Sequence, residues 1–267
     1  MKISKIFLYD EPAVQEIQIS NLKNFLLETF PVEVEVKECV FHNLDEKDIE
    51  KISCCRVFDT TSPFKKHTPN KQEIDFEKNV CKDTKLMENT IKVEDAERIE
   101  DVVMYDGFQI QNAISTTISQ DYLIQNNLHI VFTNKLTCTY DNLDHRYHGR
   151  TVICSNPAII STTGMIEAPA KSREYYLEAM KCKMQGLDMK SVKKNHSGEF
   201  LDYHDHRLSK IAEGYLLQAI FYYITGDAFC DSLNCRLNNA HWQKDLIHSQ
   251  IKISKLCKKH QKILDDL

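Results

Sequence analysis

The chain has 267 residues, of which 42% are hydrophobic and 27% are charged, values typical of a globular protein that can bury a sizeable core. Its formal net charge of −5 argues against the basic footprint of a nucleic-acid-binding protein, although the segment 252–262 is locally basic. No stretch approaches the ~18 apolar residues of a transmembrane helix, and the N-terminal apolar run is too short for a signal peptide. We therefore expect a cytoplasmic protein with neither nucleic acid nor membrane as a partner.

The N-terminal forty residues predict a strand, a helix and a second strand. Residues 2–10 contain a short apolar run, and residues 13–30 carry apolar side chains at helical spacing. Pro31 ends that helix, and residues 32–40 alternate apolar and polar side chains in the manner of a half-buried strand. A β-α-β opening of this kind predicts an α/β sheet.

The segment 59–100 is poor in large apolar residues and rich in Lys, Glu, Asp, Thr and Asn. Such a composition predicts a solvated insertion or loop, with at most a surface helix near residues 94–103.

Regular structure is expected again from residue 105 onward. The patterns predict a helix at 105–115, a strand and its turn at 128–140, one or two strands at 149–164, a helix at 172–185 and a polar loop at 186–204.

The strongest helix prediction covers residues 207–226. One face carries an apolar stripe of Leu208, Ile211, Ala212, Tyr215, Ala219, Tyr222 and Tyr223. Gly226 is placed as the residue just past the C-terminus of this helix. A last helix is expected from about residue 241 to residue 264.

Ten cysteines in a cytosolic chain do not predict a disulfide framework, because cytosolic thiols stay reduced. Three of them, with one histidine, have the spacing of metal ligands: Cys230-x4-Cys235 is followed after 21 residues by Cys257-x2-His260. Thiolate and imidazole ligands in two short-spaced pairs fit a tetrahedral Zn²⁺ site, with Cys257 and His260 on one face of the last helix. Four protein ligands leave no position for water, so the site would be structural. The alternative is three buried cysteines and an exposed histidine.

The same region resembles a metalloprotease signature. In archaemetzincins the metzincin motif H-E-x-x-H-x-x-G-x-x-H runs directly into a cysteine, then x4 and another cysteine, with a second cysteine pair downstream. Anchored on Cys230 and Cys235, the motif glycine falls on Gly226, and the second pair falls at Cys257 and His260. The zinc-binding residues do not match. Ala219, Tyr223 and Phe229 stand at the three histidine positions, Ile220 at the glutamate position and Leu237 at the Met-turn methionine.

The resemblance extends to other segments. "LHIVFTNKL" and "RTVICSNPAIISTTG" look like the paired strands that precede the archaemetzincin helix. "HRYHGRTVIC", "STTGMIEAPAKSREYY" and "CRLNNAHWQ" are similar to an archaeal family described as metallopeptidases. The resemblance implies a zincin-type α/β fold and peptide-bond hydrolysis, while the degenerate motif implies that the metzincin active site is lost.

Other polar clusters could supply a relocated catalytic site. His145 and His148 lie in "DHRYHGR", His204 and His206 lie in "DYHDHR", and carboxylates accompany both pairs, as in many hydrolytic metal sites. The simpler interpretation is that these are solvated loop histidines and a helix N-cap.

Two further segments carry candidate site residues. Ser161, Thr162, Glu167 and Lys171 occupy a loop beside a strand end, which could line a cleft or be a surface turn, and Lys171 with Arg173 could hold an anion. His241 and Trp242 follow the cysteine pair. The simpler interpretation is a helix start capped by Asn238 or Asn239 with Trp242 packed on the zinc loop, and the alternative has His241 facing the former catalytic cleft.

We therefore predict an α/β (α+β) zincin-like domain spanning residues 1–267, with a mixed sheet, a polar insertion at 59–100 and a helix–zinc knot–helix segment at 207–264. The predicted function is metallopeptidase-like with a structural Zn²⁺. The alternatives are a non-catalytic peptide- or protein-binding pseudoenzyme and a hydrolase with a relocated metal.

Overall fold

The computed structural model describes residues 3–63, 65–82, 102–118 and 126–267. The chain opens as predicted with strand β1 (Lys5–Tyr9), helix α1 (Ile19–Thr29) and strand β2 (Glu33–Lys37). Strands β1 and β2 pair in parallel, with Lys5 opposite Glu33. A parallel pair needs a crossover connection, and α1 supplies it.

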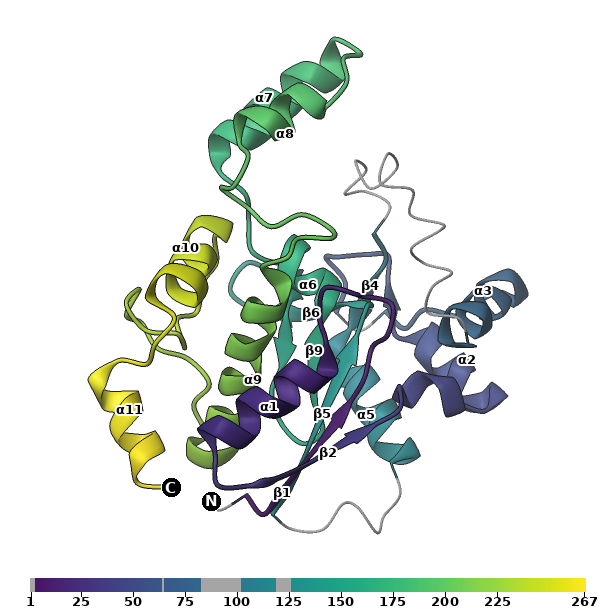
Figure 1. Cartoon of the computed structure of the whole chain (residues 1–267). Coiled ribbons are helices and arrows are strands. Elements are labelled where there is room, and N and C mark those ends of the chain that lie inside the picture. The colour runs from purple at the N-terminus through teal and green to yellow at the C-terminus, as the bar shows by residue number, and fades with distance from the viewer. Residues whose placement is uncertain (1–2, 64, 83–101, 119–125) are drawn as a thin grey trace.

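A five-stranded mixed sheet forms the centre of the molecule (Figure 1). Its strand order is β2-β1-β5-β9-β8, where β5 is Asn127–Thr133, β9 is Ala158–Ser161 and β8 is Val152–Ile153. Strands β2, β1, β5 and β9 are parallel, and β8 runs antiparallel at the edge beside β9. The predicted strands in 128–140 and 149–164 are confirmed.

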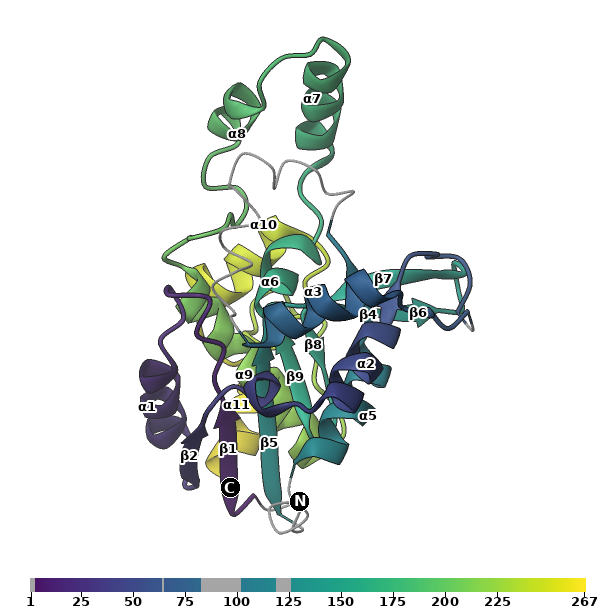
Figure 2. The ribbon, with the colours of Figure 1, turned by 90° about the vertical axis from the view of Figure 1, so that its right-hand side faces the viewer.

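Both faces of this sheet are buried, each in its own apolar core. On β1, Ile6 and Leu8 belong to one core, whereas Phe7 and Tyr9 belong to the other, as the alternation of side chains along a strand requires. Helices α1 and α9 (Leu208–Thr225) cover the first face. Helices α2 (Glu46–Cys54) and α5 (Gly107–Thr117) cover the second (Figure 2).

A second mixed sheet lies beside the first and has the order β3-β4-β6-β7. Its strands are β3 (Arg56–Val57), β4 (Met104–Asp106), β6 (Leu136–Asp141) and β7 (Arg146–Arg150). Helix η1 (Val40–Asn43) and helix α3 (Lys71–Lys82) pack close to it.

Helix α3 corrects the prediction of a solvated insertion at 59–100. The carboxylate of Glu77, on α3, is fully buried and contacts the side-chain nitrogens of Lys135 and Arg56, and the hydroxyl of Tyr105 donates to it over 2.9 Å. The two cations hold the pKa of Glu77 below its usual value even though burial alone would raise it. The segment has a polar composition because buried ion pairs of Glu77 take the place of apolar contacts between α3 and the rest of the fold. The helix expected near 94–103 falls mostly outside the described residues.

Three helices connect β9 to α9: α6 (Thr162–Glu167), α7 (Arg173–Met184) and α8 (Lys190–Asn195). The helix predicted at 172–185 is confirmed as α7. The polar loop expected at 186–204 is wrong in part, because it contains α8.

Helix α9 ends at Gly226 as predicted, with φ of +81° at that glycine. It is buried around most of its circumference rather than along one stripe, while Tyr222, which the stripe placed in the core, is 38% exposed.

The single last helix predicted from 241 to 264 is wrong. Helix α10 (Gln243–Ile247) continues into the π-helix η3 (His248–Ile253), and Ser254, at φ +49°, breaks the chain before α11 (Lys258–Asp265). Among the described helices, none combines the length and apolarity needed to cross a bilayer. The α/β class with mixed sheets and a C-terminal Cys/His cluster is confirmed.

Candidate metal centre and adjoining cleft

The loop after α9 folds back on itself and turns two cysteines inward. The N–H of Cys230 donates to the carbonyl of Leu237 over 2.8 Å, and Cys230 forms an isolated bridge with Asn238. Inside this closed loop the N–H of Cys235 donates to the carbonyl of Ser232 over 3.1 Å, and Cys235 is fully buried. We call residues 230–238 the cysteine loop.

The break at Ser254 delivers the second pair of ligands. Just after Ser254, the carbonyl of Lys255 accepts a hydrogen bond from the N–H of Arg236 over 2.9 Å. This bond joins the segment after the break to the cysteine loop. Cys257 then occupies the N-cap of α11, and His260 lies in its first turn. The prediction that both residues sit inside a helix is therefore wrong for Cys257, although the two side chains still meet.

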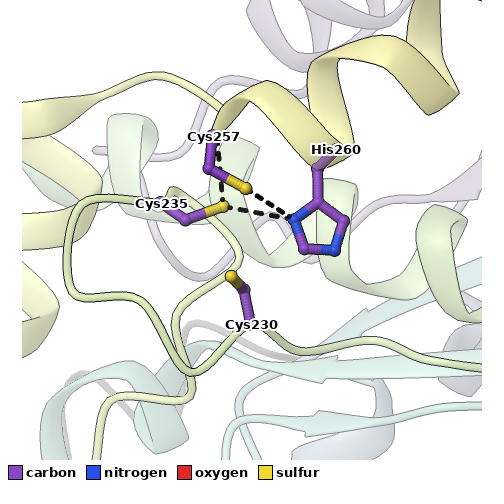
Figure 3. A group of neighbouring side chains, drawn as sticks. All are labelled: Cys230, Cys235, Cys257 and His260. Carbon is purple, nitrogen blue, oxygen red and sulfur yellow. Dashed lines mark hydrogen bonds between the residues drawn. The ribbon is translucent and has the colours of Figure 1, made fainter.

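Cys230, Cys235, Cys257 and His260 come together as one cluster, each offering a ligand atom within 4.8 Å of the others. Nδ1 of His260 lies 3.1 Å from Sγ of Cys257 and 3.6 Å from Sγ of Cys235, and Figure 3 shows the sulfur of Cys230 turned toward them. A tetrahedral zinc with ordinary Zn–S and Zn–N bonds separates sulfur and nitrogen ligands by about 3.5 Å. The residues present therefore fit a four-coordinate metal ion.

The electrostatics of the cluster also suit a cation. Burial raises the pKa of the Cys235 thiol to about 12, so ionising this thiol requires a compensating positive charge. Burial opposes ionisation of Cys257 as well, but the backbone N–H of His260 and the neighbouring sulfurs hold its pKa below the usual value. Burial lowers the pKa of His260 and so favours the neutral imidazole that a metal requires.

Contacts outside the cluster fix the orientation of its ligands. The backbone N–H of Cys257 donates to Sγ of Cys235 over 3.4 Å. The ring of His260 is 5% exposed and packs edge-on against Phe221 of α9, with ring centroids 5.7 Å apart. The Cys/His cluster thus rests directly on α9.

A cleft of about 560 Å³ lies on the other side of the cysteine loop. One wall is the run 150–154, which contains the edge strand β8. The opposite wall is α9, and residues 238–241 close one end. Among the described strands, β8 pairs with β9 alone, so its other edge has no strand partner there, and both of its residues line this cleft.

Helix α9 presents Tyr215, Gln218 and Tyr222 to the cleft. These positions differ from those that the metzincin frame assigns to zinc ligands. Ala219 and Ile220 have no exposed surface and belong to the core under the sheet. Phe229, at the third histidine position, lines the cleft with an apolar ring. Sequence reasoning missed Gln218, and the signal available was a polar side chain within the apolar and aromatic run 215–224.

A short chain of hydrogen bonds links the cleft to the cysteine loop. The side-chain amide of Gln218 donates to the carbonyl of Asn238 over 3.2 Å, and the amide of Asn238 donates to the carbonyl of Cys230 over 3.2 Å. Both side chains are nearly fully buried. Across the cleft, Nε of Arg150 donates to the hydroxyl of Thr139 over 2.8 Å. The cleft and the metal cluster therefore share one wall.

His241 and Trp242 face different cavities. Ala170 pairs with Trp242 in an isolated bridge, so the backbone here is extended and neighbouring side chains point to opposite sides. His241 lines the cleft. Trp242 is 48% exposed and borders a separate cavity of about 700 Å³, so its predicted packing on the cysteine loop is wrong. The predicted asparagine cap is also wrong, because Trp242 is the N-cap of α10.

The remaining histidine candidates do not gather at one point. Nε2 of His148 lies 2.7 Å from Asp144, and these two form a possible metal-binding group with Asp141, which lines the cleft. His145 sits in the adjoining turn at φ +58°. Among the described residues, His204, His206 and Glu167 belong to no group of three possible metal ligands.

Local contacts account for His204, His206 and Glu167. Nδ1 of His204 lies 3.1 Å from Glu16, His206 is almost fully exposed beside Asp205, and Glu167 hydrogen-bonds Tyr203, whose pKa is raised mainly by burial.

The loop around Ser161 has a structural explanation. The Ser161 hydroxyl accepts the N–H of Gly164 over 2.8 Å as the cap of α6 and donates to the carbonyl of Lys135 over 2.7 Å. The hydroxyl of Thr162 donates to the carbonyl of Thr133 over 3.2 Å. Lys171 is buried with its ammonium over the ring of Phe200. These groups are engaged within the fold.

Comparisons with known proteins place the chain at family level. No curated protein and no solved structure matches it. The model of one protein family matches residues 2–267, nearly the whole chain. The chain therefore belongs to the Probable metallopeptidase family (DUF6775).

Proposed function

We propose that this member of a metallopeptidase family binds extended peptides in the cleft between β8 and α9 without hydrolysing them through a metzincin-type zinc, and that its Cys/His cluster holds a structural Zn²⁺. The observation that carries the proposal is that β8 lines the cleft and has, among the described strands, no partner on the side away from β9.

Strand addition is the mode of binding that this wall favours. Val152 and Ile153 pair with Ile160 and Ile159 of β9 on one side only. The opposite side of an edge strand presents unpaired N–H and C=O groups, which an extended peptide can pair with irrespective of its sequence. Tyr222, which is 38% exposed, and Phe229 supply aromatic surface for the side chains of such a peptide.

The chemistry of the cluster supports zinc as its ion. Three thiolates and one imidazole are soft to borderline ligands, which favour Zn²⁺ over Mg²⁺ or Ca²⁺. Four protein ligands close a tetrahedral shell, so no position remains for a water nucleophile. The ion would clamp α11 to the cysteine loop and thereby hold the cleft wall that Asn238 shares with it.

The residues at the former ligand positions support the loss of metzincin chemistry. The resemblance to archaemetzincins places Ala219 and Ile220 where the first histidine and the glutamate base stand, and both side chains are buried in the core. The three thiols and one imidazole at the cluster then remain the chain's best metal-binding set. Ten cysteines without a disulfide support a reducing, cytoplasmic location.

A hydrolase with a relocated metal is the second candidate. Asp141, Asp144 and His148 offer three ligand atoms close together, and Asp141 lines the cleft. Arg146, 3.0 Å from Asp144, already balances part of that charge, which makes the group a weaker metal site than the cysteine cluster.

One experiment separates these functions. Purified protein is analysed for metal content and titrated with fluorescent extended peptides, each compared with a twin N-methylated at alternate amides, while the same peptides are followed for cleavage. We expect one zinc per chain, binding that N-methylation weakens, and no cleavage. Binding that N-methylation leaves unchanged would contradict strand addition. Cleavage that requires a second metal, and is lost in Asp141→Asn, would establish the second candidate instead.

A further inference from the structure

Helices α7 and α8 form a hairpin that stands away from the body of the molecule in both views (Figures 1 and 2). The inner faces of the hairpin pack on a small core of their own, formed by Tyr175, Met189, Val192 and Phe200. The hairpin is thus a projecting unit whose outer surface none of the other described elements covers extensively.

That outer surface is unusually apolar. Leu177, Met180 and Met184 follow one another at helical spacing along α7, and Leu187 continues them into the connection to α8. Exposure rises toward the far end, from 49% at Leu177 to 82% at Met184. A run of large exposed apolar side chains on one projecting element marks a contact surface rather than ordinary surface variation.

The same end of the hairpin is strongly basic. Residues 181–194 contain five lysines and one acidic residue, Asp188, although the whole chain carries a net charge of −5. Lys190 pairs with Asp188 at 3.3 Å, and Lys193 pairs with Asp202 at 3.6 Å. Lys181, Lys183 and Lys194 have no carboxylate of a described residue within ion-pair distance.

We propose that this hairpin docks the protein on an anionic lipid surface, with Met184 and Leu187 entering the interface and the lysines facing the headgroups. Apolar side chains alone would suit many partners, but their combination with a lysine cluster at the most distant point of the hairpin complements a negatively charged planar surface. Such a docking element needs neither the length nor the uniform apolarity of a membrane-spanning helix.

The test is sedimentation of the full-length protein with vesicles of neutral phosphatidylcholine and with vesicles containing 30% phosphatidylglycerol. We expect at least ~10-fold more protein on the anionic vesicles at low salt, and loss of that preference at high salt. Met184→Ser/Leu187→Ser should abolish binding, and Lys181→Gln/Lys183→Gln/Lys190→Gln should remove the preference for anionic lipid. Because these side chains are exposed, the variants should fold, which an unchanged circular dichroism melting curve verifies.

Matched controls sit elsewhere on the surface. Leu143→Ser removes a residue that is 93% exposed in the turn between β6 and β7, and Lys47→Gln/Lys71→Gln removes exposed charges near α2 and α3. Both should leave vesicle binding unchanged. Equal loss in the control variants, or no binding to anionic vesicles at low salt, would overturn the proposal. Binding of a polyglutamate peptide to the hairpin with no vesicle binding would overturn it in favour of an acidic protein partner.

Discussion

The cysteine loop and helix α9 lie next to each other, yet only the cysteine loop matches the archaemetzincin motif at the positions of its ligands. On one side of the shared wall, Cys230 and Cys235 stand at the expected offsets and meet Cys257 and His260. On α9, the positions of the first histidine and of the glutamate hold Ala219 and Ile220, whose side chains are fully buried in the core and do not line the cleft. The cysteines and the histidine of the cluster thus match the archaemetzincin spacing, whereas the residues at its catalytic positions do not.

Restoring the catalytic residues is the most severe way to test this contrast. Ala219→His/Ile220→Glu would place an imidazole and a carboxylate in the core between α9 and the sheet, where neither finds a partner. We expect a loss of about 5 kcal/mol or more in the free energy of unfolding, measured by urea denaturation, with no second zinc by metal analysis. The control is Tyr222→His, at a 38% exposed position of the same helix, which should cost less than ~1 kcal/mol. A stable double variant that binds two zinc ions would show that the cleft still tolerates catalytic ligands.

Removing a ligand from the cluster should have the next largest effect. Cys235→Ser replaces a fully buried thiolate ligand, so zinc content should fall below one per chain, and the free energy of unfolding should decrease by about 3 kcal/mol or more. The matched control is Cys54→Ser, a half-buried cysteine outside the cluster, which should retain zinc and most of the stability. If Cys235→Ser keeps a full complement of zinc, the cluster is not the zinc site.

The support under the cysteine loop can be tested separately from its ligands. A Cβ atom added at Gly214 of α9 would overlap the buried amide of Gln250, whose Nε2 donates to the carbonyl of Arg236 over 2.7 Å. Gly214→Ala should cost about 2 kcal/mol in the free energy of unfolding, because overpacking outweighs the better helix propensity of alanine. In a Gln250→Ala background the added methyl group has room, so Gly214→Ala should then cost much less. An equal cost in both backgrounds would rule out this steric explanation.

Sequence reasoning succeeded where the signal was local and failed where it depended on distant contacts. Helix α9 and its end at Gly226 were predictable from periodicity and a glycine cap, and the proximity of the three cysteines to His260 was predictable from their spacing. The break at Ser254 was not, because a serine at positive φ carries no turn signal comparable to glycine. Helix α3 was missed because a glutamate such as Glu77 normally indicates a surface position. Its burial depends on an ion pair with Lys135, which is distant in the sequence.

The residues of α9 that face the cleft could not be predicted from the sequence for a related reason. A helix buried on nearly all sides has no single apolar stripe, so periodicity could not show which of its residues face a cavity. The motif frame pointed to Ala219 and Tyr223, whereas the structure directs Gln218 and Tyr222 into the cleft, one position earlier. Only the edge strand β8 and the cysteine loop fix that direction.

The smallest effect on stability is expected for a substitution of His241, which lines the cleft but not the neighbouring cavity that Trp242 borders. His241→Ala should change the free energy of unfolding by less than ~0.5 kcal/mol, since the side chain is exposed, and it should leave zinc content unchanged. Peptide affinity should nevertheless fall several-fold, because the ring lines the cleft in which we place the peptide. Trp242→Ala is the matched control, for it removes a larger exposed ring from the next residue on the opposite side of the same backbone. Fluorescence anisotropy of the labelled peptides measures both variants. If Trp242→Ala weakens binding and His241→Ala does not, the peptide occupies the second cavity, and the shared wall between cluster and cleft has no role in binding it.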